Sequence, residues 1–477
     1  MNSMNPVRRP GRAGATMLLL AVLSAAACED DPSGPRDDGS LSRVASAHVV
    51  DTAGPLVRSL SVELDGPSGV EVFYEPIDGG RVLRMRSEQR VRSHDVLMPR
   101  LRADTTYRYV VRTWTATETS DSVLSGTFTT GPLPPEIAGL QFNVQGDATF
   151  PVVMISMRTT ATGWVGQLGI DTDGYVTWYH TVSQTALAAT RIPDSPDVLF
   201  IENGLTVDTE PDGLTRVAPD GQVVQRLDRA GTAVGKIHHD VTARDAERIL
   251  FIANETQAVG DTMVTGEAIW EWNMRTGALT QRWSAFDFLD WNTDRIGTPN
   301  PTNWLHANSI SVGPRGNVVV SFRSLNQVIS IAPDYQSLEW RIGGPNATHA
   351  IANDDRFIGQ HSAWELDGGR LLVFDNRGAG PDGADLARAL ELEIGADSVE
   401  FAWEYAPGIQ AFLRGSVYRL DNGNSVVTFP AFSFVIDEVD ADGQLVWRLS
   451  GDNSFTPAYR GVPWPSIAGE EEVAAMP

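Results

Sequence analysis

The sequence predicts an all-β protein in which an antiparallel β-sandwich is followed by a six-bladed β-propeller. The 477 residues include 44 glycines and 28 prolines, enough for many tight turns between short strands. Residues 42–131 alternate apolar and polar positions in short runs, and six similar strand–turn–strand units follow them. A chain of this length also exceeds one hydrophobic core, so more than one domain is expected.

The N-terminus has the pattern of an export signal. Arginines precede the apolar run MLLLAVLSAAAC, which is too short to span a membrane as a mature helix and ends in small residues before Cys28. We interpret residues 1–28 as a lipoprotein signal peptide with Cys28 as the lipidated residue; an ordinary signal peptide cut nearby is the alternative. Residues 29–41 form a polar tether. The expected product is an exported lipoprotein, periplasmic or on the cell surface, anchored at Cys28.

Residues 42–131 form the predicted sandwich. Runs such as SVELDG, GVEVFYEP and YRYVVRTW are separated by turn residues, which indicates antiparallel strands. The segment LMPRLRADTTYRYVVR resembles the strand E to F region of fibronectin type III domains, in which a tyrosine, here Tyr107, locks the corner. The stiff segment GPLPP ends this unit. The propeller is assigned to residues 136–469, and residues 470–477 are left as a tail.

Six hairpins of one type define the propeller. Each has a strand, a turn centred on Gly or Asp, and a returning strand, and four of them end in an apolar-x-Trp sequence. The hairpins are IDTDGYVTWYH, VAPDGQVVQRL, WNMRTGALTQRW, IAPDYQSLEWRI, LEIGADSVEFAWEY and VDADGQLVWRL. They recur at intervals of about 50 residues, a period typical of propeller blades with four strands each. Six copies therefore predict six blades.

Three of the segments between these hairpins begin with histidine. HDVTARDAERILFI starts at His239, HANSISVGPRGNVVVSF at His306 and HSAWELDGGRLLVF at His361, and two further copies have Ala188 and Gly415 at that position. If these segments are the innermost strands, their first residues meet at one end of the central channel. One histidine at a strand start is usually a satisfied hydrogen-bond partner. Three of only eight at one repeat position favour a site.

Two neighbouring residues complete this candidate cluster or border it. Arg323 ends VVVSFR, the strand that leaves His306, and its guanidinium offers a fork of donors suited to a tetrahedral oxyanion. An ion pair with an acid of a neighbouring blade is the alternative role for Arg323. His238 precedes His239 and, by strand alternation, should point the other way.

Aromatic residues are concentrated in the loops around these segments. An aromatic wall suits flat ligands, although packing between blades is an alternative role for such residues. The substrate-binding candidates are Trp291, Trp304, Phe432 and, from the segment NWLHANS, Asn308.

The net charge limits the partners. A formal net charge of -24 argues against nucleic acid or anionic lipid, because phosphate binding needs a basic face. We therefore expect contact with a membrane only through the lipid anchor. A small anionic substrate is compatible with this charge, since a local cationic pocket can lie within an acidic surface.

Three imidazoles and a guanidinium, without an obvious carboxylate cluster, suit transfer of an anionic group. One neutral imidazole attacks, the other groups stabilise charge, and a covalent histidine intermediate divides the reaction in two. Three imidazoles also suit zinc or iron, so a His-ligated metal-dependent hydrolase or oxygenase is an alternative. The arginine would be a poor neighbour for a dication, and we expect neither a metal nor another cofactor. A third hypothesis is a non-catalytic exported propeller that binds a partner.

The HHD, NWLHANS, VSFRSLNQ and GQHS segments together resemble bacterial arylsulfate sulfotransferases, the arylsulfotransferase (ASST) family. The resemblance extends over most of the chain, from about residue 42 to residue 469. It implies a periplasmic or lipid-anchored enzyme with a β-sandwich and a six-bladed propeller. It also implies a small aryl sulfate as donor and a phenol as acceptor, without the nucleotide donor of cytosolic sulfotransferases.

The same resemblance assigns roles to the clustered residues. It implies that His361 is the nucleophile of a ping-pong reaction through sulfohistidine. His239, His306 and Arg323 would bind the sulfuryl oxygens and assist proton transfer. Some members of the family carry a disulfide near the active site, which this chain cannot form because Cys28 is its only cysteine.

Overall fold

The computed structural model describes residues 41–120, 123–203, 212–378, 386–430, 434–451, 455–456 and 459–477. Within these ranges the regular structure is β-strand apart from three short 3-10 helices, which confirms the all-β prediction. These helices are η1 (Ala285–Asp287), η2 (Arg323–Leu325) and η3 (Asn353–Asp355). In the described part of the chain, no helix is long and apolar enough to cross a membrane. The predicted signal peptide, its Cys28 and the tether up to residue 40 lie outside the described residues.

The N-terminal strands form two antiparallel layers that share one long strand. The strands are β1 (Val44–Asp51), β2 (Arg58–Pro76), β3 (Val82–Arg86), β4 (Val91–Met98), β5 (Thr106–Trp114), β6 (Leu124–Thr129) and β33 (Glu471–Val473). The first part of β2 pairs with β1 and β4, and its second part pairs with β3 and β5. The Tyr107 hydroxyl accepts a hydrogen bond of 2.8 Å from the Arg102 backbone N–H, the bond expected of a corner tyrosine. β33 pairs with β3, so part of the segment set aside as a tail extends this sheet.

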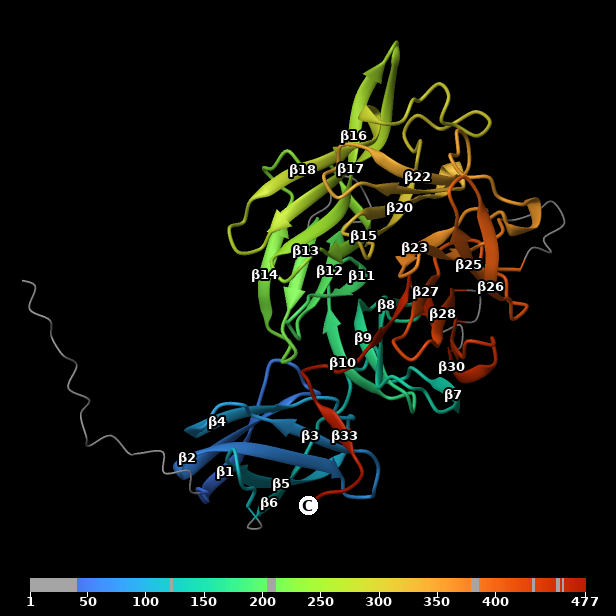
Figure 1. The fold of residues 1–477 in the computed structure, drawn as a ribbon. Coiled ribbons are helices and arrows are strands. Elements are labelled where there is room, and N and C mark those ends of the chain that lie inside the picture. The colour runs from blue at the N-terminus through green and yellow to red at the C-terminus, as the bar shows by residue number, and fades with distance from the viewer. Residues whose placement is uncertain are drawn as a thin grey trace, which may run out of the picture. The chain divides into compact units, whose positions relative to one another are not determined.

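Six further antiparallel sheets form the blades of a propeller, as the six hairpins predict (Figure 1). The strands, from the channel outward, are β32 (Gly461–Trp464), β8 (Val152–Thr159), β9 (Val165–Asp171) and β10 (Val176–Thr181) in blade 1; β11 (Thr185–Arg191), β12 (Val198–Asn203), β13 (Gly213–Val217) and β14 (Val223–Asp228) in blade 2; β15 (Ile237–Ala243), β16 (Arg248–Val259), β17 (Thr262–Asn273) and β18 (Leu279–Ser284) in blade 3; β19 (Ala307–Val312), β20 (Val318–Phe322), β21 (Gln327–Ile331) and β22 (Leu338–Gly343) in blade 4; β23 (His361–Leu366), β24 (Arg370–Asp375), β25 (Arg388–Ile394) and β26 (Val399–Tyr405) in blade 5; and β27 (Ser416–Arg419), β28 (Ser425–Pro430), β29 (Phe434–Val439) and β30 (Leu445–Gly451) in blade 6.

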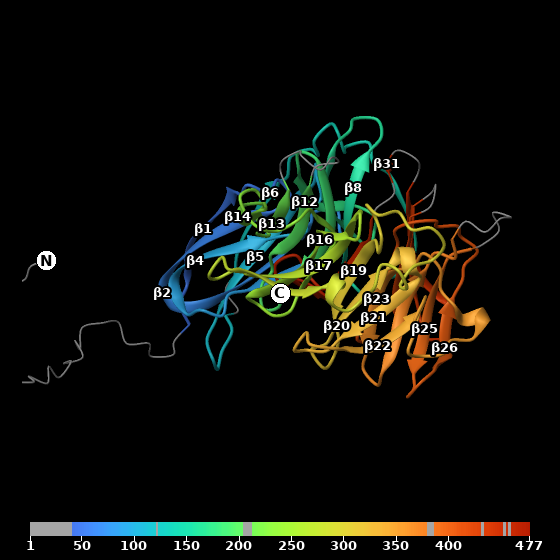
Figure 2. The same cartoon turned by 90° about the horizontal axis from the view of Figure 1, so that it is seen from above.

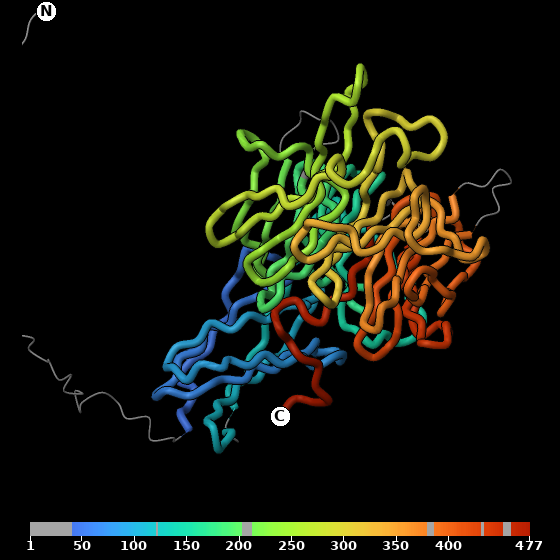
Figure 3. Tube along the Cα trace, turned by 45° about the horizontal axis from the view of Figure 1, so that its top comes forward, coloured from blue at the N-terminus to red at the C-terminus, as the bar shows by residue number. Residues whose placement is uncertain are grey.

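Both ends of the propeller segment close the ring. β7 (Phe142–Gly146) pairs with β30 at the outer edge of blade 6, while β32 pairs with β8 and supplies the innermost strand of blade 1. The colours of Figure 3 follow the chain around the ring until the red C-terminal segment returns to the first blade. A two-residue strand, β31 (Phe455–Thr456), pairs with the other end of β8 and lies beside it in Figure 2.

The repeated tryptophans join successive blades. Trp178 of blade 1 is fully buried, and its indole N–H donates to the Pro219 carbonyl in blade 2 at 3.0 Å. Trp447 of blade 6 is likewise buried and donates to the Thr172 carbonyl in blade 1 at 3.0 Å. Each ring therefore fills apolar space between two sheets and satisfies its only polar group on the neighbouring turn. This accounts for the apolar-x-Trp ending of these two hairpins.

Candidate functional site

The innermost strands begin with a backbone kink. Ala188, His239 and His306 have φ values of 50°, 58° and 54°, in the left-handed region, and these are the positions that the repeat alignment makes equivalent. In blade 5 the left-handed residue is Ser362, one position after His361, with a φ of 51°. The strand register also shifts next to each of these residues. A non-glycine residue in this conformation costs about 1–2 kcal/mol. The kink breaks the ordinary alternation of side chains, so alternation alone does not decide where these histidines point.

The structure brings the three predicted histidines together around an unpredicted tyrosine. The ring of His239 lies 4.7 Å from that of His306 and 6.0 Å from that of Tyr459, measured between centroids. The ring of His361 lies 6.4 Å from the same tyrosine. His238 contacts His239 from behind, with 2.7 Å between the two Nδ1 atoms. His239 therefore belongs to the cluster, and His238 contacts it directly instead of pointing away from it as strand alternation predicts.

The hydrogen bonds around His361 determine its tautomer. The side-chain amide of Asn376 donates to the carbonyls of Ala411 and Arg414 at 2.7 and 3.0 Å, so its oxygen faces His361. The His361 Nδ1 lies 2.7 Å from that oxygen and 3.1 Å from the Gly359 carbonyl, both of which can only accept. Nδ1 therefore carries the hydrogen. Nε2 keeps its electron pair and accepts the Arg414 backbone N–H at 3.1 Å.

All three histidines are held in the neutral form. Burial lowers the pKa of His361 to about 3; the Asn376 hydrogen bond opposes this shift, while the charges of Arg323 and Arg460 add to it. Burial and then the charge of Arg323 lower the pKa of His306 to about 4. Burial also lowers the pKa of His239 well below its usual value, with further contributions from the neighbouring histidines and Arg460. At neutral pH the cluster is therefore a set of uncharged imidazoles beside cationic groups.

Arg323 is a cation beside the cluster for which the described residues include no acidic partner. It begins η2, and its backbone N–H donates to the His306 carbonyl at 3.1 Å. Its charge lowers the pKa of both His306 and His361, which places it near both rings. Across the described residues no carboxylate lies within ion-pair distance of Arg323, so the predicted alternative of an acid in a neighbouring blade has no support in that part of the chain.

Two site residues that the sequence analysis missed come from the C-terminal segment. Tyr459 and Arg460 immediately precede β32, the innermost strand of blade 1. The Tyr459 hydroxyl and the Arg460 Nη2 both donate to the Asn308 carbonyl, at 3.1 and 2.9 Å. The Arg460 Nη1 forms a buried ion pair of 2.8 Å with the Asp240 Oδ1. The available signal was the segment YRGVPW after the sixth hairpin, where a ring-closing strand would be expected.

The predicted substrate-binding residues differ in how far they are exposed, and two of the three that the structure describes are buried. Trp304 is 1% exposed and its indole N–H donates to the Asp294 carbonyl at 2.7 Å, so it packs in the core rather than lining an open wall. Trp291 is partly exposed and packs edge-on against Trp304. Asn308 is buried, and its side-chain amide donates to the Gln360 carbonyl at 2.7 Å, which joins blades 4 and 5. Phe432 lies outside the described residues.

The described side chains of the site do not have the arrangement of a metal centre. In the ranges that the structure describes, no three His, Cys, Asp or Glu side chains are arranged so that they could hold a metal ion together. The donors near the cluster are instead the Arg323 guanidinium, which has no carboxylate partner in the described ranges, and the Arg414 N–H. Such donors suit a tetrahedral anion.

The fold and the site thus define a six-bladed propeller with a cluster of neutral histidines and arginines at one end of its channel. Residues 144–428 match the family model described as Arylsulfotransferase (ASST), which covers more than half of the chain and includes His239, His306, Arg323 and His361. The protein belongs to the arylsulfotransferase family. Membership supports aryl sulfotransferase activity in general, with an aryl sulfate as donor and a phenol as acceptor.

Solved structures with similar folds are distant in sequence. A protein of unknown function from Bacteroides caccae is 15% identical, with 65% of this chain and 98% of that chain covered and a TM-score of 0.44. The periplasmic gluconolactonase of Pseudomonas aeruginosa is 13% identical, with 68% and 99% covered and a TM-score of 0.36. Virginiamycin B lyase from Staphylococcus aureus is 13% identical, with 65% and 99% covered and a TM-score of 0.29. A comparison with curated proteins finds no match.

Proposed function

We propose that this protein transfers a sulfuryl group from an aryl sulfate to a second phenol by a ping-pong reaction in which His361 is sulfated at Nε2. The observation that carries the proposal is the fixed tautomer of His361. Asn376 Oδ1 and the Gly359 carbonyl hold the hydrogen on Nδ1, so the electron pair is on Nε2, and the lowered pKa keeps it unprotonated. A neutral imidazole of this kind is a competent nucleophile.

In the first half-reaction, Nε2 attacks sulfur and the bond between sulfur and the aryl oxygen breaks. The first phenol leaves as phenolate with the electron pair of that bond. The hydrogen bond from the Arg414 N–H to Nε2 must be given up, and that donor is then available to a sulfuryl oxygen. Positive charge develops on the imidazole ring and is stabilised by the two acceptors at Nδ1.

In the second half-reaction, the oxygen of the acceptor phenol attacks sulfur and the nitrogen–sulfur bond breaks. The phenol gives its proton to His239 or His306, which are neutral and can therefore act as a base. His361 returns to its starting form. The proton released here equals the one that the first phenolate takes up, so the cycle is balanced. Arg323 stabilises the sulfuryl oxygens in both steps, because no acid in the described residues neutralises it.

Two further features belong to the same proposal. We infer that the protein is exported and anchored through a lipid on Cys28, which rests on the sequence MLLLAVLSAAAC. We also infer that the N-terminal unit is a fibronectin-III-like sandwich. The two layers that share β2 and the hydrogen bond between Tyr107 and the Arg102 N–H support this assignment.

The test is transfer from 4-nitrophenyl sulfate to a second phenol by the full-length protein. We expect nitrophenolate release to depend on the second phenol and to fall by about a thousandfold or more in His361→Asn. In rapid mixing without acceptor, one equivalent of nitrophenolate should be released per protein, because the sulfated enzyme then accumulates.

His48→Asn, in β1 of the N-terminal unit, is the matched control and should retain full activity. Full transfer by His361→Asn would remove His361 from the mechanism. Release that is independent of the second phenol would indicate hydrolysis instead.

A further inference from the structure

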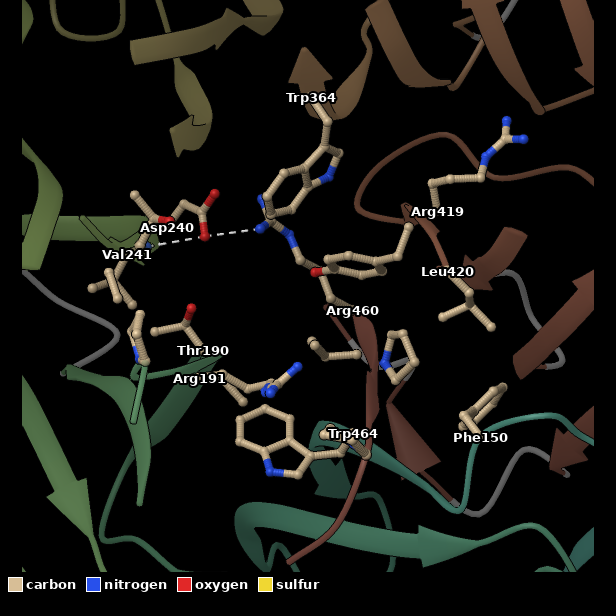
Figure 4. A pocket seen from close by; sticks show the side chains of 18 of the residues that line it. Phe150, Thr190, Arg191, Asp240, Val241, Trp364, Arg419, Leu420, Arg460 and Trp464 are labelled. Atoms are coloured by element: carbon tan, nitrogen blue, oxygen red, sulfur yellow. Dashed lines mark hydrogen bonds and ion pairs between the residues drawn. The ribbon is translucent and has the colours of Figure 1, made fainter. Parts of the chain in front are cut away.

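A cavity of about 390 Å³ lies at the opposite ends of the innermost strands from the histidines. It is bordered by Thr190 and Arg191 at the end of β11, by Thr242 in β15, by Arg419 at the end of β27 and by Trp464 at the end of β32 (Figure 4). His239 is the third residue of β15, His306 immediately precedes β19, and His361 begins β23. We call this space the distal cavity. Its volume is in the range of small-molecule sites.

The buried ion pair between Asp240 and Arg460 separates the distal cavity from the histidines. Asp240 and Arg460 both border the cavity, and the dashed line in Figure 4 marks their contact. The residue before each of them, His239 and Tyr459, belongs to the histidine cluster. Asp240 also accepts hydrogen bonds from the backbone N–H groups of Val241 and Ile310, at 3.0 and 2.7 Å, which hold it in place. The distal cavity is thus a compartment of its own.

Aromatic rings contribute much of the cavity wall. Trp364 and Tyr418 are tilted against each other, with 5.3 Å between ring centroids, and Trp464 and Phe150 also border the space. Figure 4 draws the Trp364 and Trp464 side chains approaching the cavity from different strands. Aromatic walls of this kind favour a planar apolar ligand.

The cavity wall includes hydrogen-bond donors that have no acceptor in the described chain. The Nε of Arg460 is buried and has no hydrogen-bond acceptor among the residues that the structure describes. The Arg419 guanidinium, by contrast, points away from the cavity in Figure 4 and pairs with Glu391. The Arg460 side chain is only 5% exposed, so water does not readily satisfy it. Arg191 is exposed at the mouth and pairs with no carboxylate in the described ranges.

The remaining charges limit how much negative charge a ligand can carry. Asp240 neutralises Arg460, and Arg419 forms an ion pair with Glu391. The exposed Asp421 also borders the cavity, and its negative charge offsets the positive charge of Arg191. One acceptor group is therefore favoured, whereas a polyanion would be repelled.

We propose that the distal cavity is a second binding site, separate from the histidine cluster, for a planar aromatic molecule that carries one acidic acceptor group such as a carboxylate or sulfonate. The rings hold the aromatic part, and the unpartnered Nε of Arg460, together with Arg191, binds the acceptor. The site does not depend on sulfuryl transfer.

The test is binding of naphthalene-2-sulfonate to the full-length protein by isothermal titration calorimetry. The carbon–sulfur bond of this probe cannot be transferred, so binding is measured without turnover. We expect Arg191→Gln to weaken binding at the distal cavity by about tenfold, through loss of a charge-assisted hydrogen bond. Thr190→Phe should fill the cavity and abolish binding there. His361→Asn should leave that binding unchanged.

Arg275→Gln is the matched control, because Arg275 is an exposed arginine at a turn of blade 3 and does not border the cavity. Circular dichroism verifies that each variant folds. If Thr190→Phe does not fold, the test is made with Arg191→Gln alone. The proposal is overturned if the probe does not bind up to about 5 mM. It is also overturned if Arg191→Gln and any folded Thr190→Phe protein bind the probe as tightly as the unmodified protein does. Loss of all binding in His361→Asn would likewise overturn it.

Discussion

The residues at the histidine end of the channel differ between the two sides of the ring. Blades 3, 4 and 5 contribute His239, His306 and His361, three titratable groups held neutral. Blades 6 and 1 contribute the Arg414 backbone N–H and the ring of Tyr459. The groups that can exchange protons or form covalent bonds are therefore on one side. The other side supplies a fixed donor and an aromatic surface.

Two of the arginines beside the cluster, Arg323 and Arg460, follow the same division. Arg323, on the histidine side, has no carboxylate partner in the described chain, whereas Arg460, on the side of blade 1, is neutralised by Asp240. An arginine that is already paired adds little net charge for a substrate anion. A cation near the histidines is therefore not necessarily a substrate-binding group. It adds net charge for a substrate anion only if no carboxylate already pairs with it.

The largest expected effect separates these two arginines. Arg323→Met should lower kcat/KM for aryl sulfate by about 10²- to 10³-fold, because a donor to the sulfuryl oxygens is lost, and should leave the Tm nearly unchanged. Arg460→Met should instead lower the free energy of unfolding by about 3–5 kcal/mol, because Asp240 is left buried without its partner. Steady-state kinetics and thermal unfolding of both variants measure this difference. Equal losses of stability in the two variants would contradict the assignment of Arg323 to substrate binding and of Arg460 to the fold.

A smaller effect is expected from the residue that orients the nucleophile. Asn376→Leu removes the acceptor at Nδ1 of His361, so both tautomers become populated and kcat should fall by about 10- to 100-fold, as for other partners that orient a functional histidine. Nitrogen-15 NMR of the imidazole should change from the Nδ1–H form to a mixture. The exposed Asn353→Leu is the control. An unchanged tautomer with reduced activity would indicate a purely structural effect.

Acid should destabilise the histidine side in particular. The pKa of His361 is about 3 in the folded protein, against an ordinary value near 6.5, so the unfolded chain binds a proton between these values and the folded chain does not. The contribution of each such histidine to the free energy of unfolding is therefore fully present above about pH 6.5. It is lost as the pH falls toward 3, by up to about 1.4 kcal/mol per pH unit. Urea unfolding at about pH 7 and about pH 5 should show a weaker dependence in His361→Asn. An identical dependence would contradict the lowered pKa.

The smallest effect is expected on the aromatic side. Tyr459→Phe removes only the hydrogen bond to the Asn308 carbonyl, a neutral bond worth about 1 kcal/mol, and keeps the ring. We expect kcat to change by less than about threefold. Tyr459→Ala removes the ring and should raise KM instead. A loss of kcat in Tyr459→Phe as large as that in Arg323→Met would show that the hydroxyl takes part in proton transfer.

The internal repeat made much of this architecture predictable. Six hairpins predicted six blades, and one repeat position predicted that His239, His306 and His361 meet, because equivalent strands of a propeller converge on one axis. The repeat could not predict Tyr459 and Arg460, since their strand pairs with β8 from the other end of the chain. Nor could it predict Asn376, whose role depends on two carbonyls of the next blade. Trp304 was misjudged because a sequence does not show which side of a loop is covered.

The closure of the ring by β32 also sets the time at which an active molecule can first exist. Tyr459, Arg460 and β32 follow all the other blade strands along the chain, and until they are synthesised the edge of β8 is open and Asp240 lacks the Arg460 cation. An open edge of this kind invites pairing with other chains. A nascent chain, or one clipped by a protease ahead of residue 459, therefore carries all three histidines and still lacks a finished pocket. Assembly of the site would then depend on whether β32 has been made and has paired with β8.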